Sequence, residues 1–134
     1  MEVIYRTDRC LGLEEFNDIL VRSTLADRRP VDDPDRLSEM LSAYTLIVTA
    51  WSGPLLVGVS TAWTDFAYTC YLADLAVDRQ HQHQGIGRRL VALTGEAAGK
   101  RTNLILLAAP KAAAYYPKIG MHRFIDCFVK CREE

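Results

Sequence analysis

The stretch that decides the fold runs from Leu75 to Leu90 and reads LAVDRQHQHQGIGRRL. An apolar strand ends at its start, a polar turn follows, and Gly85 and Gly87 open an amphipathic helix. Backbone N–H groups at a helix start lack partners, and the helix dipole is positive there, so the position suits a phosphate. Glycine also removes the Cβ that would hold an anion away from the backbone. Taken alone, the pattern is as typical of tight helix–sheet packing.

Upstream residues predict an opening strand at 2–6, two helices, a hairpin and a further strand at 68–77. Apolar residues at helical spacing mark the two helices: Leu13, Phe16, Ile19 and Leu20, then Leu37, Met40, Leu41 and Tyr44. Asp33 and Pro34 suit the N-cap and first residue of the second helix. The hairpin is predicted from the strand-like residues 45–51 and 55–64 around a turn at 52–54.

Downstream residues predict a parallel crossover. The helix from Ile86 is followed by the apolar run 103–109, which is typical of a strand covered on both faces and parallel to its neighbour. A short helix over about 111–118, stopped near Gly120, and a final strand at 122–130 complete the chain. The predicted fold class is α+β in one domain, residues 1–134. Its mixed central sheet is antiparallel in its N-terminal part and passes into a parallel C-terminal pair, with helices on both faces.

Composition excludes several function classes. Sixteen basic against seventeen acidic residues give a net charge of -1, so no global field attracts nucleic acid or an anionic membrane. No apolar run approaches the roughly 20 residues of a spanning helix, and the N-terminus shows no secretory leader, so a cytoplasmic location is expected. Four cysteines without Cys-x-x-Cys spacing are expected to be reduced, buried or half-buried thiols, and no metal site is predicted.

Two segments resemble one family. A P-loop is absent, and Leu90 stands where the dinucleotide fingerprint needs a glycine. Residues Gln82 to Gly87 resemble the diphosphate signature Gln/Arg-x-x-Gly-x-Gly/Ala of the GNAT superfamily of N-acetyltransferases. At the correct distance, Ala112 to Met121 resembles that family's Ala-x-x-Phe-Tyr-x-Lys-x-Gly-Phe segment. The order of elements matches over nearly the whole chain.

The resemblance implies a cofactor, acetyl-CoA, and roles for named residues. The fourth and fifth strands would splay and admit the pantetheine arm, with the Leu75 N–H polarising the thioester carbonyl and Val77 pairing with pantetheine. Backbone N–H groups from about His83 to Arg88 would hold the diphosphate. Tyr116 would protonate the departing thiolate. The implied cofactor-binding residues are Leu75, Ala76, Val77, Gln82, His83, Gln84, Gly85, Ile86, Gly87, Arg88 and Tyr116.

Two catalytic assignments have alternatives. Pro117 disfavours the α conformation at Tyr116, so the helix is expected to end a turn early, and Tyr116 could instead pack on the sheet. Asp74 is the only acid in the fourth strand and is the candidate base, but strand alternation puts it on the face opposite Ala73 and Leu75. Its alternative is a structural acid, bonded to backbone or facing solvent.

The resulting function is an acetyl-CoA-dependent N-acetyltransferase. The acceptor would be a primary amine of a small molecule or peptide, attacking directly in a ternary complex between the first two helices and the C-terminal strands. The alternatives are a catalytically silent acyl-CoA-binding regulatory module and a protein-binding scaffold. The aromatic residues on the hairpin and around the fourth strand are expected to be core rather than a substrate cage: Trp51, Trp63, Phe66, Tyr68 and Tyr71. A homodimer is expected because the final strand would leave an unpaired sheet edge.

Overall fold

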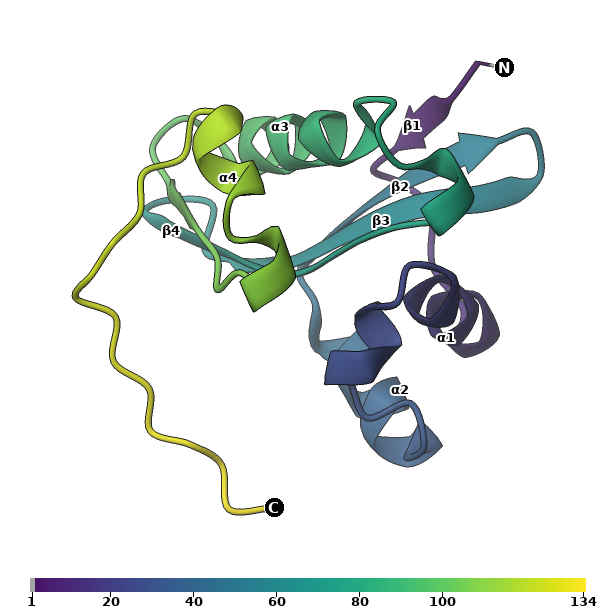
Figure 1. Cartoon of the computed structure of the whole chain (residues 1–134), viewed down its shortest axis with the longest axis horizontal. Helices are drawn as coiled ribbons and strands as arrows, with labels where there is room; N and C mark the ends of the chain where they lie inside the picture. The colour runs from purple at the N-terminus through teal and green to yellow at the C-terminus, as the bar shows by residue number, and fades with distance from the viewer. Residues whose placement is uncertain (1) are drawn as a thin grey trace.

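A computed structural model describes residues 2–134 and contains a five-stranded sheet with helices on both faces (Figure 1). The strands lie in the order β1-β2-β3-β4-β5, with antiparallel pairs up to β4 and a parallel pair between β4 and β5. Their bounds are Ile4–Arg6, Leu46–Ser52, Leu55–Thr64, Thr69–Val77 and Asn103–Ile105. This mixed sheet confirms the predicted fold class.

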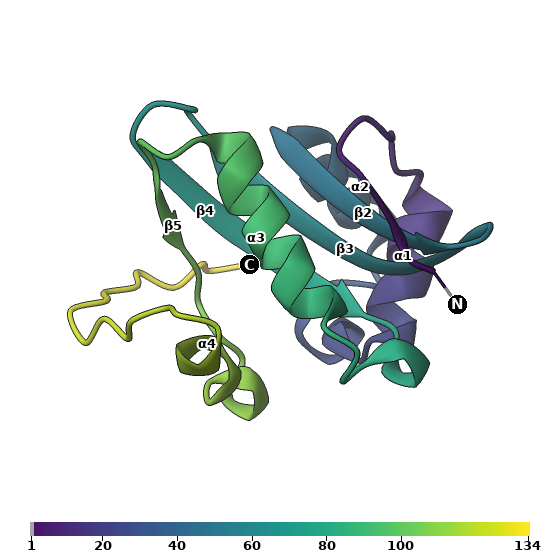
Figure 2. The ribbon, with the colours of Figure 1, turned by 90° about the horizontal axis from the view of Figure 1, so that it is seen from above.

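Helices cover the two faces unequally. On one face lie α1 (Leu13–Arg22), the 3-10 turn η1 (Leu25–Arg28) and α2 (Pro34–Ala43). On the other face α3 (Ile86–Ala98) crosses the sheet and joins β4 to β5 (Figure 2). The remaining pieces are η2 (Arg79–His81), η3 (Pro110–Ala112) and α4 (Tyr115–Lys118).

Each face has its own apolar core. Phe16, Leu20 and Leu37 pack from α1 and α2 onto the sheet and are at most 1% exposed. Ile86 and Leu90 of α3 pack on the opposite face, where Val48 and Val57 meet them. Complete burial of a side chain of this size contributes about 1.5–3 kcal/mol. The two layers therefore hold the sheet rigid beneath the loops that leave its edges.

A β-bulge in β4 separates β4 from β5. Thr61 pairs with Asp74 and Ala62 pairs with Leu72, so Ala73 is the extra residue on β4. The parallel pairing with β5 is confined to Thr69–Tyr71. Past the bulge no strand among residues 2–134 pairs with the far edge of β4, and the gap opens as the predicted splay requires.

Upstream predictions are confirmed closely. Both predicted helices, the hairpin and its turn at Gly53 appear, and the Asp33 carboxylate accepts a hydrogen bond from the Arg36 N–H at 3.2 Å as the N-cap of α2. The structure adds η1, for which no periodicity in the sequence gave a signal.

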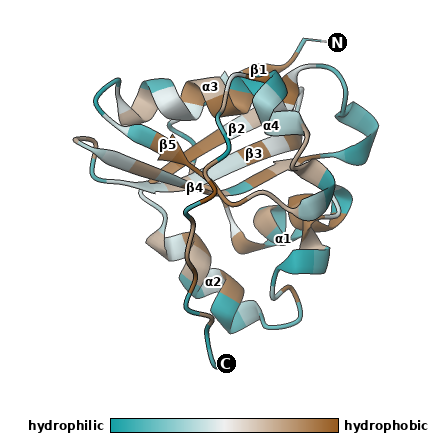
Figure 3. Cartoon of the chain, turned by 60° about the vertical axis from the view of Figure 1, so that its left-hand side comes forward, coloured by the Kyte–Doolittle hydropathy of each residue, from teal (hydrophilic) through white to brown (hydrophobic). Residues whose placement is uncertain are grey.

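The C-terminal predictions need correction. The predicted strand 103–109 is paired only over Asn103–Ile105, because the bulge directs β4 away, and Leu107 is 55% exposed rather than covered. The predicted strand at 122–130 is wrong for this structure, since the segment forms no ladder and extends past β5 (Figure 3). Strand propensity alone does not make a strand when no neighbouring edge is aligned with it.

The last helix and the cysteines also differ from expectation. The predicted helix 111–118 is split into η3 and the single turn α4, which begins at Tyr115 instead of ending there. Pro117 lies in that first turn, where its missing N–H removes no hydrogen bond. Only Cys70 is buried, whereas the other three cysteines, all free thiols, are exposed in segments without strand pairing: Cys10, Cys127 and Cys131.

Candidate active site

The loop before α3 has the geometry of an anion cradle. His83 and Gly85 have φ values of 64° and 83°, in the left-handed region. The first helical hydrogen bond runs from the Arg89 N–H to the Gly85 carbonyl at 3.0 Å, so the N–H groups of the preceding residues at the helix start have no carbonyl within α3. A Cβ built on Gly85 would meet nothing within 4 Å. Glycine is therefore required there by the backbone, and the space above it is open.

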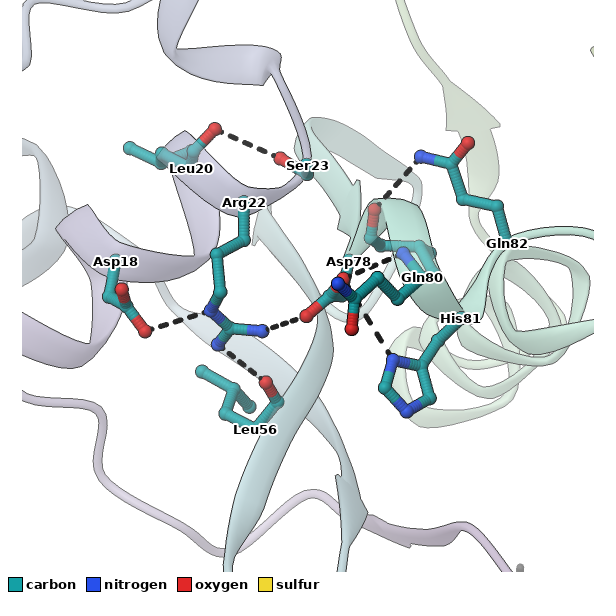
Figure 4. A network of polar contacts seen from close by, with 10 residues as sticks. Asp18, Leu20, Arg22, Ser23, Leu56, Asp78, Gln80, His81 and Gln82 are labelled. Atoms are coloured by element: carbon teal, nitrogen blue, oxygen red, sulfur yellow. Dashed lines mark hydrogen bonds and ion pairs between the residues drawn. The ribbon is translucent and has the colours of Figure 1, made fainter.

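An ion pair from α1 anchors this loop (Figure 4). Asp78 ends β4 and accepts hydrogen bonds from the Gln80 N–H at 2.8 Å and from the Arg22 guanidinium. Arg22 also donates to the Leu56 carbonyl at 2.7 Å. Burial disfavours the charged form of Asp78, but the Gln80 and Arg22 contacts outweigh it and lower its pKa. The loop thus leaves the sheet in a fixed direction.

The free edge of β4 presents alternate backbone groups to the gap. The Asp78 N–H donates to the Val57 carbonyl at 2.9 Å, so Asp78 faces β3 and alternation turns Ala76 the same way. Leu75 and Val77 then face the gap. Two side chains already use this edge, because Arg29 Nη2 donates to the Ala73 carbonyl and Gln82 Nε2 to the Val77 carbonyl.

A cleft of about 890 Å³ lies along this edge. Leu75 and Asp74 of β4, Leu107 and Ala109 after β5, and Tyr116 of α4 are among the residues that line it. Its other wall comes from η1 and α2. A second cavity, of about 760 Å³, is lined by residues 103–108. Tyr116 lines both this cavity and the cleft. Tyr116 therefore lies between the two cavities.

The two tyrosines of α4 point to different places. Their rings are 5.3 Å apart in an edge-to-face arrangement at 77°. The Tyr115 hydroxyl lies 3.0 Å from the position of a Cβ on Gly87, so Gly87 permits this close approach to the first turn of α3. Burial, followed by the neighbouring Tyr115, raises the pKa of Tyr116, which keeps its hydroxyl protonated at neutral pH.

Asp74 is buried at the base of the cleft, 1% exposed, and its carboxylate has three donors. Arg29 Nε lies 2.6 Å from Oδ1, while the Tyr44 hydroxyl and Thr61 Oγ1 lie 2.5 Å and 2.6 Å from Oδ2. Burial and then the Asp74 charge raise the pKa of Tyr44, so that its hydroxyl is a donor. Asp74 faces α1 and α2, opposite Leu75 as alternation predicts.

The remaining predicted residues divide by exposure. Gln82, His83 and Gln84 are exposed on the loop and Arg88 is exposed on the first turn of α3, whereas Ile86 is buried and can offer only its backbone. Burial raises the pKa of Tyr115, and the positive charge of Arg88 partly offsets this rise. Arg88 therefore lies on the side of α3 that is near α4. Ala76 is buried against the α1 layer, so neither its side chain nor its backbone faces the gap.

Sequence reasoning missed the partners of these residues. Arg22, Arg29 and Tyr44 reach Asp78 and Asp74 across 30 to 56 residues of chain. Side chains that pair from separate elements show no fixed spacing in the sequence. The only sequence signal is an acid within a predicted buried strand, because a buried carboxylate must have polar partners. No helix among residues 2–134 has the length and apolar character needed to cross a membrane. The same residues contain no group of three or more His, Cys, Asp or Glu arranged to hold a metal ion.

Comparison with known proteins identifies the family. Residues 44–121 match the acetyltransferase (GNAT) domain, which covers both motif segments. No curated protein matches the chain in sequence.

Solved structures share the fold at low identity. A probable acetyltransferase of unknown function from meticillin-resistant Staphylococcus aureus aligns with 97% of this chain and 100% of its own, at 16% identity and a TM-score of 0.75. A GNAT-family protein from Streptococcus pneumoniae aligns over 99% and 100% respectively, at 22% identity and a TM-score of 0.73. An aminoglycoside N-acetyltransferase in complex with CoA aligns over 98% and 95%, at 16% identity and a TM-score of 0.73.

Proposed function

Because the chain belongs to the GNAT acetyltransferase family, we propose that it transfers an acetyl group from acetyl-CoA to a primary amine held in the cleft beside Asp74 and Tyr116. The observation that carries this proposal is the combination of a splayed β4 edge with an open anion cradle at its end. The acceptor is a small molecule or a peptide. The relatives include aminoglycoside acetyltransferases, so amine acceptors are known among proteins of this fold.

The residues present fit acetyl-CoA. The left-handed Gly85 and the N–H groups at the start of α3 suit the diphosphate, and the exposed Arg88 adds a positive charge. The N–H groups of Leu75 and Val77 face the gap where the amides of the pantetheine arm would lie. When bound, acetyl-CoA supplies an activated thioester carbonyl. Every other contribution comes from the chain itself.

Leu75 and Tyr116 would act on different atoms of a bound thioester. The backbone N–H of Leu75 is held by the sheet and needs no reorganisation to donate to the oxygen on which negative charge develops. A preorganised donor of this kind is worth about 3 kcal/mol of barrier reduction. The Tyr116 hydroxyl, kept protonated by its raised pKa, would donate its proton to the leaving sulfur.

Asp74 is the proposed base for the amine proton, because it is the carboxylate of β4 and lines the cleft. Oδ2 accepts two hydrogen bonds and Oδ1 accepts one, so the second lone pair of Oδ1 is the position left for the amine proton. An Asp74 that never takes the proton would instead be a positioning residue that fixes Arg29 and Tyr44.

We also propose a homodimer formed through the C-terminal segment 122–130. Four large apolar side chains of this segment are 65–90% exposed: Phe124, Ile125, Phe128 and Val129. The edge of β5 beside them has no further strand among the described residues. A second copy could cover both features. Light scattering should give a dimer mass for the wild type and a monomer mass for Phe128→Asp. The control Phe66→Asp changes an exposed phenylalanine outside this segment and should remain a dimer. A monomeric wild type at micromolar concentration contradicts the dimer.

A cytoplasmic location agrees with the three exposed free thiols, which persist in a reducing compartment. The engaged oxygens of Asp74 also support the second candidate, a CoA-binding module without turnover. Release of free thiol from acetyl-CoA, measured with and without a panel of amines, separates the two. Amine-dependent release supports the enzyme, and CoA binding without it supports the module.

A further inference from the structure

Three aromatic rings form a continuous wall in the acceptor half of the cleft. Tyr44, Trp63 and Tyr71 all line it. The rings of Trp63 and Tyr71 are stacked, 5.9 Å apart and within 7° of parallel, and Tyr44 lies 5.2 Å from Trp63. Trp63 is 40% exposed, whereas the other tryptophan, Trp51, is 6% exposed and packed in the core. The expectation that these aromatic residues belong to the core is therefore wrong for Trp63, and for Phe66 and Tyr68, which are 50% and 73% exposed, whereas Tyr71 is half-buried.

The rings are fixed before any ligand arrives. Trp63 and Tyr71 are direct cross-strand partners, and the bulge at Ala73 puts Tyr71 on the same face as Asp74. Tyr44 is held by its hydroxyl, which donates to Asp74 at 2.5 Å. A preorganised aromatic surface binds a flat group with little loss of side-chain entropy. Trp63 thus belongs to a preformed aromatic surface of the cleft and is not a loose surface residue.

The charges of the cleft argue against a polycationic acceptor. Its carboxylates are Asp27, Asp74 and Glu134, and Asp74 is neutralised by Arg29. Four arginines line the same cleft: Arg28, Arg29, Arg36 and Arg132. A compound with several ammonium groups would find more positive than negative side chains there.

We propose that the acceptor is an arylalkylamine, a primary amine joined by a short chain to an aromatic ring that lies against Trp63 and Tyr71. This inference rests on the proposed acetyl transfer and names its substrate class. The β3 partners of Tyr71 and Asp74 are Trp63 and Thr61, two residues apart, so the rise between Tyr71 and Asp74 is roughly 7 Å. The ring therefore lies a few methylene groups away from the amine that reaches Asp74 and Leu75.

Calorimetric titration of the CoA-loaded protein tests the ring requirement without turnover. The probes are 4-phenylbutylamine and 4-cyclohexylbutylamine, which share the amine and chain and differ in the π system. Hydrophobic burial alone favours the cyclohexyl compound, whereas aromatic contact favours the phenyl compound by about three- to tenfold in Kd. Trp63→Leu should remove this phenyl preference, and Tyr71→Leu should reduce it. Phe66→Leu, an exposed aromatic residue of the β3–β4 turn, should retain it.

Two results overturn the proposal: equal or tighter binding of the cyclohexyl compound to the wild type, and preferential binding of 1,4-diaminobutane or kanamycin. Acetylation assays with the same compounds keep the two proposals apart. Turnover of amines without phenyl preference contradicts the aromatic subsite and leaves acetyl transfer standing. Phenyl-selective binding without any turnover contradicts acetyl transfer and leaves the subsite standing.

Discussion

Arg22 of α1 and Asp78, the residue after β4, form an ion pair that ties α1 to the loop before α3 (Figure 4). Asp78 in turn caps η2 through the Gln80 N–H. The loop and α1 are therefore braced against each other through one guanidinium.

Arg22→Ala should lower the free energy of unfolding by about 2 kcal/mol, because it removes charged hydrogen bonds to Asp78 and Leu56. It should also weaken CoA binding by loosening the cradle. Arg6→Ala is the matched control, since the Arg6–Asp8 pair is exposed and should leave both quantities unchanged. Denaturant unfolding and a CoA titration measure them. A variant with normal stability and normal CoA affinity would show that the brace has no role.

Gly85→Glu should abolish the CoA-induced rise in Tm, because its carboxylate would lie in the space proposed for the diphosphate. Gly53→Glu is the control: Gly53 is also left-handed, at φ 58°, with nothing within 4 Å, but lies in the β2–β3 hairpin. Both variants should lose about 1 kcal/mol of stability from backbone strain. Only Gly85→Glu should lose the response to CoA. An undiminished response there would move the cofactor site elsewhere.

Tyr116→Phe should lower kcat by about 10²-fold while leaving acetyl-CoA affinity nearly unchanged. The protonated hydroxyl is the donor, and burial raises its pKa above the ordinary value of about 10. Wild-type kcat should therefore hold through neutral pH and fall as pH rises through that raised value, whereas the variant should show no such fall. Tyr68→Phe, an exposed tyrosine outside the cleft, is the control. Retention of more than about a third of wild-type kcat, with chemistry rate-limiting, removes Tyr116 as the acid, because a thiolate with a pKa of about 8.5 leaves readily.

Asp74→Asn should lower the free energy of unfolding by about 3 kcal/mol, because Arg29 loses a buried partner. If Asp74 takes the amine proton, we expect kcat to fall about 10²-fold at pH 7 and the deficit to shrink as pH approaches an alkylamine pKa of about 10. Asp27→Asn, at an exposed carboxylate of the same cleft, should change neither quantity. A deficit that is equal at every pH would assign Asp74 a positioning role alone.

The sequence was most informative where function depends on backbone. Gly85 could be predicted because a left-handed turn before a helix restricts residue type, and Asp33 because an N-cap does the same. Contacts such as Tyr44 to Asp74, or Trp63 to Tyr71, depend on strand register and on the bulge at Ala73. A bulge of one residue changes which side chains of a strand lie on the same face of the sheet. No local sequence pattern indicates where such a bulge occurs.

The error at the C-terminus has a different origin. Phe124 and Phe128 have strand propensity and apolar side chains, and the interpretation as a final strand assumed that a partner edge lies within the same chain. The structure leaves these side chains 84% and 90% exposed. Propensity predicts that a segment can pair, and tertiary contacts decide whether it does.

Release of free thiol from acetyl-CoA, with and without a panel of primary amines, tests the central claim most directly. We predict amine-dependent release that matches the N-acetylated product mole for mole and exceeds the rate of hydrolysis, and that disappears in Gly85→Glu at the same acetyl-CoA concentration. A wild-type protein that binds CoA but releases no thiol with any amine would contradict the claim and identify the chain as a binding module.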